Sequence, residues 1–169
     1  MAKQTIPTSI RLLVMIVVVA LVRPAQAGEP KSLLAPENVT VQELHKFFKA
    51  ALFDAEFDKD GDLLIKDGGM KTFVLVDKDR QSITFISVWP LKASVSELAK
   101  LQFLNRLNDK LIMVRFCMPR PTTLWCDYVL QYGGGVTPFM VVNSYRTFAK
   151  VVKGAAATMD PNDIIGTDG

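Results

Sequence analysis

The side chains best suited to chemistry in this chain are two thiols and one imidazole, which belong to Cys117, Cys126 and His45. A cysteine thiolate can act as a nucleophile beside a histidine base, and both residue types bind zinc. Three such residues are too few for the four ligands of a structural zinc site. His45 also lies among apolar residues of a predicted helix, which favours a histidine at the edge of the core. We therefore predict no metal site, no cofactor and no catalytic residue, with a Cys–His pair as the alternative.

The two cysteines lie in a predicted β-hairpin, whose strands cover about residues 111–118 and 123–132. A register in which Met118 faces Trp125 leaves residues 120–123 as the loop and places Cys117 opposite Cys126. Directly opposed residues of a non-hydrogen-bonded pair have Cα atoms about 4.5 Å apart, which a disulfide can span. A shift of one residue would turn one sulfur to the other face of the sheet. The sequence therefore predicts a disulfide between Cys117 and Cys126, provided that this register holds.

A run of acidic residues between positions 56 and 67 partly matches the calcium-binding loop of an EF-hand. Asp58, Asp60 and Gly61 would take positions three, five and six of such a loop. Glu56 stands where an aspartate is usual, and Asp67 stands where a bidentate glutamate is needed. Both flanks have the composition of strands and not of helices. The stretch is therefore predicted to be an Asp-Gly hairpin turn, with calcium binding as the alternative.

Three further features have a structural and a functional interpretation. Asn108 falls on the apolar side of a predicted helix, which favours an amide that satisfies backbone groups near the helix end. The glycines at 133–135 precede a helix but lack the lysine and spacing of a phosphate-binding loop, which favours a simple turn. Trp89 and Trp125 are predicted to be sheet aromatics, and would mark a partner surface if they were exposed together.

The first 27 residues have the pattern of a secretory signal peptide. Lys3 and Arg11 supply positive charge, residues 12–22 are apolar, and residues 25–27 read Ala-Gln-Ala. An apolar run of eleven residues is short for a membrane-spanning helix, which needs about 20. We expect cleavage between Ala27 and Gly28, with retention of the segment as an anchor as the alternative. The product would be soluble and periplasmic or secreted, a location where cysteine pairs are usually oxidised.

The charge of the chain gives no sign of nucleic-acid binding. The chain has 20 basic and 17 acidic residues, and three of the basic residues but none of the acidic ones lie in residues 1–27. The remaining chain is therefore neutral and lacks the basic patch that a phosphate backbone requires.

The order of predicted elements is that of an α+β domain with an antiparallel sheet and its helices on one face. Helices are expected at about residues 41–52, 95–109 and 138–153, with capping boxes beginning at Thr40 and Ser94 and a Thr-Pro start at Thr137. A meander of short strands at 53–57, 62–66, 71–77 and 82–89 separates the first two helices, and the cysteine hairpin separates the last two. Residues 28–38 are expected to be an extended lead-in, and residues 154–169 a loosely held tail that begins where Gly154 ends the last helix.

Residues 39–153 resemble the YbjN domain family. The resemblance rests on the stretch 104–110, on the strand Met113-Val114-Arg115-Phe116, on the acidic hairpin at 58–62 and on Gly134-Gly135-Val136 after the strand that holds Asp127. It implies a fold similar to that of type III secretion chaperones, which often dimerise, and a role as a sensory-transduction regulator without an established reaction. The resemblance therefore implies a binding role and no active site.

The leading functional hypothesis is an exported, non-enzymatic binding protein of the cell envelope with a chaperone-like or regulatory role. Its expected partner is a client protein or a second copy of the chain, and no membrane contact is expected after cleavage of the signal. Two alternatives stay open. One is a structural or stress-related envelope protein without a specific client, and the other is an enzyme with an unrecognised site around Cys117.

Overall fold

The computed structural model describes residues 33–166, so the predicted signal peptide and the cleavage site at Ala27 and Gly28 lie outside the described residues. A short 3-10 helix, η1 (Pro36–Asn38), is followed by the helices α2 (Val41–Ala50), α3 (Glu97–Lys110) and α4 (Pro138–Thr158). The strands are β1 (Asp54–Phe57), β2 (Leu63–Asp67), β3 (Met70–Asp77), β4 (Ser82–Pro90), β5 (Arg115–Arg120) and β6 (Thr123–Gln131). The predicted order of helices, meander and hairpin is confirmed.

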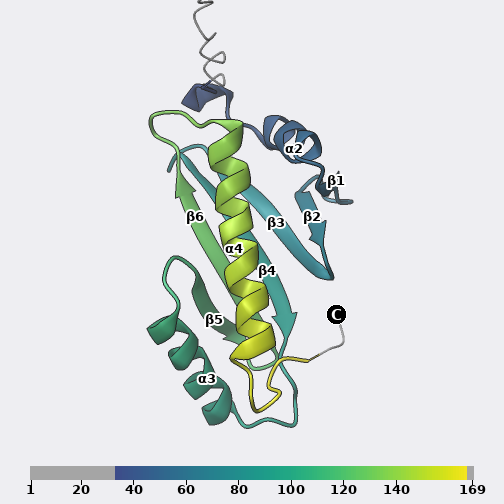
Figure 1. Ribbon diagram of the computed structural model, residues 1–169, viewed down its shortest axis with the longest axis vertical. Coiled ribbons are helices and arrows are strands. Elements are labelled where there is room, and N and C mark those ends of the chain that lie inside the picture. The colour runs from purple at the N-terminus through teal and green to yellow at the C-terminus, as the bar shows by residue number, and fades with distance from the viewer. Residues whose placement is uncertain (1–32, 167–169) are drawn as a thin grey trace, which may run out of the picture. The chain divides into compact units, whose positions relative to one another are not determined.

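The six strands form one antiparallel sheet in the order β1-β2-β3-β4-β6-β5 (Figure 1). The strands β1 to β4 of the meander are neighbours in the sheet. The β5–β6 hairpin joins them because β6 pairs with β4. The edge strands are therefore β1 and β5, which lie on opposite sides of the sheet.

Each α-helix begins at a hydroxyl side chain that accepts a hydrogen bond from the third backbone N–H of the helix. The side-chain oxygens of Thr40, Ser96 and Thr137 accept from the backbone N–H groups of Glu43, Ala99 and Met140, respectively. The caps expected at Thr40 and Thr137 are confirmed, whereas the second helix is capped by Ser96 and not by Ser94. It therefore begins two residues later than its sequence suggested.

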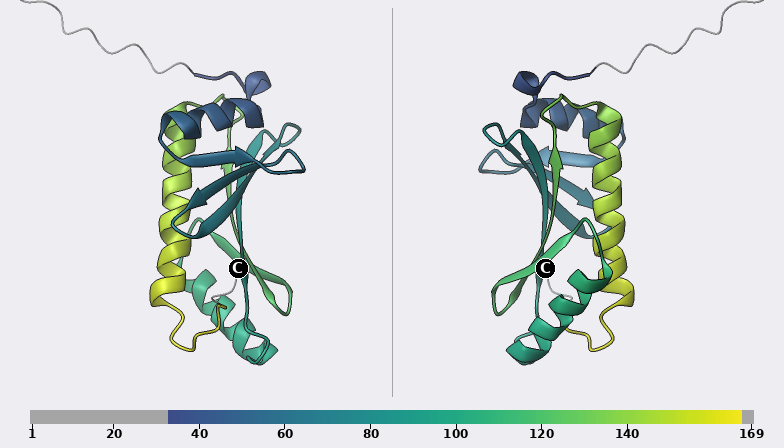
Figure 2. Two further views of the ribbon diagram at one scale, coloured as in Figure 1. Left: turned by 90° about the vertical axis from the view of Figure 1, so that its right-hand side faces the viewer. Right: turned by 90° about the vertical axis from the view of Figure 1, so that its left-hand side faces the viewer.

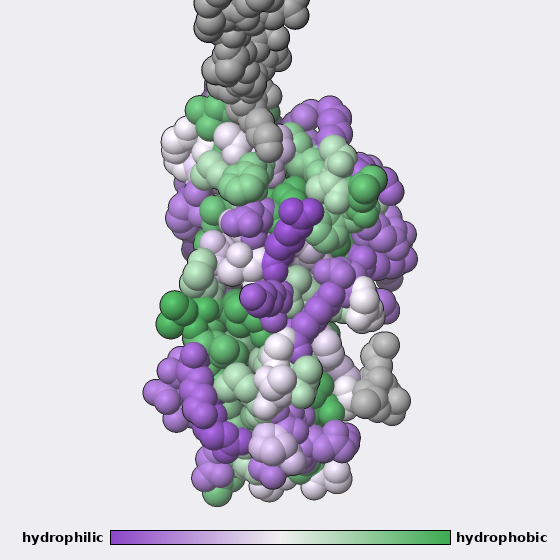
Figure 3. Space-filling model, in the orientation of Figure 1, coloured by the Kyte–Doolittle hydropathy of each residue, from purple (hydrophilic) through white to green (hydrophobic). Residues whose placement is uncertain are grey.

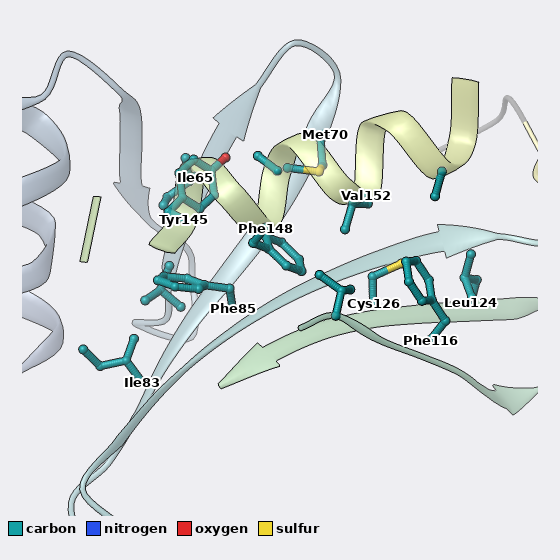
Figure 4. Close-up of a cluster of buried hydrophobic side chains, with 14 of the residues drawn as sticks. Ile65, Met70, Ile83, Phe85, Phe116, Leu124, Cys126, Tyr145, Phe148 and Val152 are labelled. Atoms are coloured by element: carbon teal, nitrogen blue, oxygen red, sulfur yellow. The ribbon is translucent and has the colours of Figure 1, made fainter. Parts of the chain in front are cut away.

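The helix α4 lies along one face of the sheet and supplies much of the core (Figures 1 and 2). Figure 4 shows Tyr145, Phe148 and Val152 pointing from α4 toward Phe85 and Cys126 on the strands. The rings of Tyr145 and Phe85 meet edge to face with 5.8 Å between centroids, an arrangement that aromatic pairs prefer. Within residues 33–166, no helix has both the length and the apolar composition to cross a membrane.

The sequence places Leu98, Leu101, Leu104 and Asn108 on one apolar side of α3, but of these only Leu104 is buried. Leu98 and Leu101 are 66% and 48% exposed, whereas Phe103 and Leu107 are fully buried. Lys100 is also buried, and its ammonium donates to the carbonyl oxygen of Pro121 at 2.7 Å. This bond attaches α3 to the β5–β6 turn.

The C-terminal boundary also differs from the prediction. The helix α4 passes through Gly154 and ends at Thr158, because a single glycine costs a helix only about 1 kcal/mol and the flanking residues pack on the sheet. Beyond it, Ile164 and Ile165 are buried and Ile165 pairs with Leu91. Both carboxylate oxygens of Asp160 accept hydrogen bonds from this segment, at 2.8 and 2.7 Å. Residues 160–166 are therefore part of the packed domain and not a loose tail.

Candidate binding surface

The acidic stretch forms the turn of the β1–β2 hairpin, as predicted. The Oδ1 atom of Asp58 accepts hydrogen bonds from the backbone N–H groups of Asp60 and Asp62, both at 2.9 Å. Asp67 lies at the other end of β2 and forms an ion pair of 2.7 Å with Lys153. The carboxylates are therefore not gathered around one point, and the part of the chain that the structure describes holds no group of three His, Cys, Asp or Glu residues placed to bind a metal ion.

His45 and Cys117 do not form a catalytic pair, because they lie at opposite edges of the sheet. Five strand spacings of about 4.8 Å separate β1 and β5 by roughly 24 Å. His45 is half-buried on α2, where its ring lies 4.9 Å from the ring of Phe57 and its Nε2 donates to the carbonyl oxygen of Ala55 at 3.2 Å. The predicted histidine at the edge of the core is confirmed.

The disulfide predicted between Cys117 and Cys126 is absent, and both residues are free thiols. Cys117 pairs with Trp125, and Cys126 pairs with Phe116, which is one residue away from the predicted register. The expected register holds next to the turn, where Arg120 pairs with Thr123, and a bulge between Cys117 and Arg120 shifts it. Since a shift of one residue reverses the face of a side chain, the two sulfurs point to opposite sides of the sheet.

Pro119 explains the position of this bulge. Proline has no N–H to donate to a ladder and is found in sheets at edges and bulges. Pro119 lies within the edge strand β5, and Pro121 and Thr122 form the turn. The bulge is therefore the way in which β5 accommodates a proline.

The two thiols differ in surroundings, and neither is activated. Cys126 is 1% exposed and packs in the core near Phe116 (Figure 4), and burial raises the pKa of its thiol. Burial also raises the pKa of the half-buried Cys117 thiol, with a further contribution from the carboxylate of Asp127. A thiol with a raised pKa forms less of the nucleophilic thiolate at neutral pH. The surroundings of Cys117 are thus the opposite of those that activate a cysteine nucleophile.

Both edge strands are covered by helices that hydrogen-bond to them through one side chain. Asn108 of α3 donates from Nδ2 to the carbonyl oxygen of Phe116 at 2.9 Å and accepts from its N–H at 3.0 Å. His45 of α2 donates one such hydrogen bond, from its Nε2 to the carbonyl oxygen of Ala55 on β1. The predicted role of Asn108 is confirmed, although its side chain is exposed and not buried. Pairing of another chain with these edges is therefore obstructed at Phe116 and at Ala55.

The three glycines at 133–135 form a turn from β6 into α4, as predicted. Gly135 has φ of +89°, and a Cβ atom there would lie 2.7 Å from the carbonyl oxygen of Leu34. Val136 pairs with Leu34 directly beyond it. Position 135 therefore requires glycine, because its φ is positive and because the carbonyl oxygen of Leu34 lies too close for a Cβ atom. These two constraints account for the glycine without any bound ligand.

The two tryptophans lie on opposite faces of the sheet. Trp89 pairs with buried Leu124 and faces α4, and its Nε1 donates to the hydroxyl of Ser87 at 3.0 Å. Trp125 pairs with Val88 on the other face and is 38% exposed. Only Trp125 therefore marks an accessible surface of the sheet.

The face of the sheet turned away from α4 carries no helix among the described residues (Figure 2). We call it the open face and define it by six apolar residues that alternate with core residues along β3, β4 and β6. Four of them are exposed and two are half-buried: Leu75, Val88, Trp125 and Val129, then Phe73 and Ile86. Cross-strand pairs hold them together, since Phe73 pairs with Ile86 and Val88 pairs with Trp125. The sheet thus presents several apolar side chains to solvent, with Thr84 between Leu75 and Val129.

Two ion pairs neutralise charged groups on the open face, whereas Lys71 on β3 has no ion pair within residues 33–166. The Nη2 of Arg115 donates to Asp127 at 2.9 Å, and its Nε lies 3.1 Å from both carboxylate oxygens. The hydrogen bonds to Asp127 also raise the pKa of Arg115. Lys66 and Glu56 form a second ion pair of 2.6 Å. The face therefore offers apolar side chains and little net charge.

The opposite side of the molecule is more mixed. Figure 3 shows hydrophilic side chains along the exposed side of α4 and hydrophobic ones at the left, over the loop between α3 and β5. Ile112 and Met113 in this loop are 80% and 57% exposed.

Periodicity in the sequence could identify the strands. Which of their two faces a helix covers is decided by the packing of α4.

The fold defines the molecule as an α+β domain whose sheet is covered by α4 on one face and bears exposed apolar residues on the other. The family model YbjN, described as "Putative bacterial sensory transduction regulator", matches residues 40–160. The chain therefore belongs to the YbjN family, as its sequence suggested.

Two solved structures are similar to this chain. The crystal structure of YbjN from E. coli, described as a "putative transcription regulator", has 14% sequence identity and a TM-score of 0.65, and covers 80% of this chain and 99% of its own. The type III secretion chaperone SycH from Yersinia pestis, solved in complex with a stable fragment of YscM2, has 11% identity, a TM-score of 0.46 and coverage of 68% and 98%. No curated protein matches the chain.

Proposed function

We propose that this protein is an exported, non-enzymatic binding protein with a chaperone-like or regulatory role in the cell envelope, and that it binds a protein partner through the open face. The open face carries the proposal, because exposed apolar residues that gather on one face of a soluble domain mark an interaction site. The family description as a sensory-transduction regulator is compatible with such a role.

The chemistry of the open face favours a polypeptide partner. Its exposed residues are one tryptophan and three aliphatic side chains, a composition similar to that of the apolar centre of protein interfaces. Because the charges of Arg115 and Asp127 are already paired, a partner needs no opposing charge at this position.

Export is supported by the sequence pattern of residues 1–27, which places cleavage between Ala27 and Gly28. A domain exported in this way would meet partners in the envelope. The role of the protein would then be to hold or sense a polypeptide in that compartment.

The test uses a photo-crosslinking amino acid at Val129 on the open face and, as a control, at Leu98 on α3. Both positions are exposed, at 47% and 66%, but only Val129 belongs to the open face. We expect a discrete crosslinked polypeptide from Val129 and not from Leu98. The identified partner, once purified, should bind the wild-type domain and lose at least tenfold in affinity for Val129→Asp. Equal crosslinking from the two positions, or unchanged affinity for Val129→Asp, would contradict the proposal.

A further inference from the structure

The helix α4 carries an unbalanced set of charges that neither the fold nor the open face explains. Its 21 residues include Arg146, Lys150 and Lys153 but no acidic residue. Spacings of four and three residues place these side chains on one side of the helix, and Figure 3 shows hydrophilic side chains along the exposed side of α4. Like charges four residues apart weaken a helix. All three residues lie more than one turn from its end at Thr158, so the helix dipole does not offset this repulsion.

Only one of these three charges is balanced within residues 33–166. Lys153 forms an ion pair of 2.7 Å with Asp67. Arg146 and Lys150 are exposed and form no ion pair in this part of the chain. The guanidinium of Arg146 lies over the ring of Phe53, 5.6 Å from its centroid, which is an attractive cation–π arrangement. Arg146 is therefore held in place by a neutral group, which leaves its charge available to a partner.

The neighbouring helix α2 and the residues after it add another charge and an apolar side chain. Lys49 is exposed and has no ion pair among the described residues. Leu52 is 93% exposed, and its N–H donates to the carbonyl oxygen of Lys49 at 3.0 Å. Leu52 also precedes Phe53, the residue that Arg146 covers. These contacts bring Lys49, Leu52 and Arg146 together where α2 ends beside α4.

The backbone of Leu52 is strained. Its φ is +65°, a left-handed conformation that ends many helices and is usually taken by glycine. The N–H of Phe53 donates to the carbonyl oxygen of Phe48 at 3.0 Å, which completes the hydrogen bonds of a Schellman motif. A leucine in this position weakens the motif and buries almost no apolar area, so packing within the described chain does not account for it. Strain of this kind gathers at binding sites.

The acidic residues around this region do not balance its charge. Glu43 of α2 pairs with Lys46 at 2.5 Å. Asp54 belongs to β1, where its cross-strand neighbour is Lys66, and it forms no ion pair in residues 33–166. The result is a surface with three unbalanced positive charges and one apolar side chain. We call it the α2–α4 surface and define it by Lys49, Leu52, Arg146 and Lys150.

We propose that the α2–α4 surface binds an acidic segment of a partner polypeptide, with an apolar residue of that segment against Leu52 and its carboxylates against Arg146 and Lys150. Arginine can hold a carboxylate through two parallel hydrogen bonds, and lysine adds a point charge. Four residues of helix separate Arg146 and Lys150 by about 6 Å along the axis. Alternate side chains of an extended segment are about 7 Å apart. Acidic residues at two alternate positions would therefore match the two basic residues.

A polypeptide segment fits this surface better than an anionic membrane does. Asp54 is two residues from Leu52, a separation of at most about 7 Å in an extended chain. This is less than the screening length of about 8 Å at physiological ionic strength, so a flat anionic surface on Leu52 would be repelled by Asp54. One leucine also gives a membrane little apolar area to bury. A narrow segment can instead follow α4 away from β1 (Figure 1).

The α2–α4 surface lies on the side of the sheet that α4 covers and not on the open face, so the inference goes beyond the proposed function. The probe is a displayed library of random decapeptides, selected on the full chain. We expect peptides with one apolar residue and acidic residues at alternate positions, which bind more weakly as salt is added. Their affinity should fall at least tenfold for Arg146→Glu/Lys150→Glu. The control Lys78→Glu/Arg120→Glu reverses the same two charges at other exposed positions and should bind like the wild type.

The variant Leu52→Gly separates binding from folding. Glycine adopts a positive φ without strain, so the melting temperature should rise. The affinity for the selected peptides should nevertheless fall at least threefold, because the apolar contact is lost. A purely structural role for Leu52 would not move these two measurements in opposite directions. If the reversed charges disturb α4, Arg146→Gln/Lys150→Gln keeps the test valid and should also lower the affinity.

Three results would overturn the inference. The first is a selection that yields no acidic peptide, and the second is unchanged affinity for Arg146→Glu/Lys150→Glu. The third is loss of affinity for Val129→Asp, which would place the peptides on the open face. Binding to phosphatidylglycerol vesicles that requires Arg146 and Lys150, without any selected peptide, would assign the surface to a membrane instead. Absence of a crosslink from Val129, with peptide binding intact, would count against the proposed function alone.

Discussion

The side chain of Asn108 replaces a neighbouring strand for Phe116. Its amide donates to the carbonyl oxygen of Phe116 at 2.9 Å and accepts from the N–H at 3.0 Å, as a backbone peptide of an adjacent strand would do. One residue on α3 therefore satisfies both backbone groups at the open edge of β5. The two backbone groups of Phe116 are therefore not available for pairing with another chain.

Substitution of Asn108 by alanine should destabilise the domain by about 1–3 kcal/mol, since the donor and acceptor of Phe116 lose their partners. The variant should also aggregate more readily, because the edge of β5 becomes available for pairing. Chemical denaturation followed by circular dichroism measures the first effect and light scattering the second. Asn105→Ala, one turn earlier on α3 and without a side-chain hydrogen bond within residues 33–166, is the control and should change little. Equal stability of the two variants would refute the role of Asn108.

Arg115→Ala should cost about 1 kcal/mol of stability, because it leaves the buried carboxylate of Asp127 unpaired. The loss of a partner of a fully buried ion costs about 3–5 kcal/mol, but Arg115 is 72% exposed, so water reduces the effect. Urea denaturation measures the difference. Arg120→Ala on the same strand removes an exposed arginine that has no ion pair in residues 33–166, and should be neutral. Adding Asp127→Leu to Arg115→Ala should restore stability, and failure to do so would show that the pair has another role.

The unreduced, denatured protein should contain two reactive thiols per chain, because Cys117 and Cys126 lie on opposite faces. In the native protein, only Cys117 should react with a maleimide-type reagent. Since its pKa is raised by burial, its rate at pH 8 should be below that of a free cysteine and should keep rising as the pH increases beyond the usual cysteine range. Mass spectrometry of alkylated samples counts the thiols and measures these rates. Detection of a Cys117–Cys126 cross-linked peptide would contradict the register described here.

Asp58→Ala should weaken the β1–β2 turn by about 1 kcal/mol, because its carboxylate accepts two backbone hydrogen bonds. Asp60→Ala is the control, as the Asp60 side chain makes no hydrogen bond within the described chain. Calcium should leave the melting temperature unchanged, whereas a ligand at 100 times its dissociation constant adds about 2.7 kcal/mol. A calcium-dependent rise that Asp58→Ala removes would restore the EF-hand-like interpretation.

The protein isolated from its native cells should begin at Gly28. The pattern of residues 1–27 predicts removal by signal peptidase, which would leave a neutral domain in the soluble envelope fraction. N-terminal sequencing of fractionated cells tests the prediction, and replacement of Ala25 and Ala27 by bulky residues should block processing. Recovery of a soluble form with an intact residue 2 from the cytoplasm would contradict export.

The sequence alone was sufficient to predict the α+β class, the order of the elements and the membership of the YbjN family. The family followed from a resemblance, whereas the class and the order of elements depend on local signals, namely alternation of apolar residues, capping hydroxyls at Thr40 and Thr137, and turn residues around Asp58 and Gly135. Each signal acts within a few residues of the element it specifies, so no tertiary information is needed to interpret it.

Only the tertiary structure decided the faces of the elements and, with them, the candidate binding sites. The bulge before Arg120 moved Cys117 away from Cys126, and α3 buries Phe103 and Leu107 while Leu98 is exposed. A local pattern specifies which residues share a face, but long-range packing decides which face is covered. The open face arises because α4 packs on the other face of the sheet, against residues such as Phe85 that lie far from it along the chain.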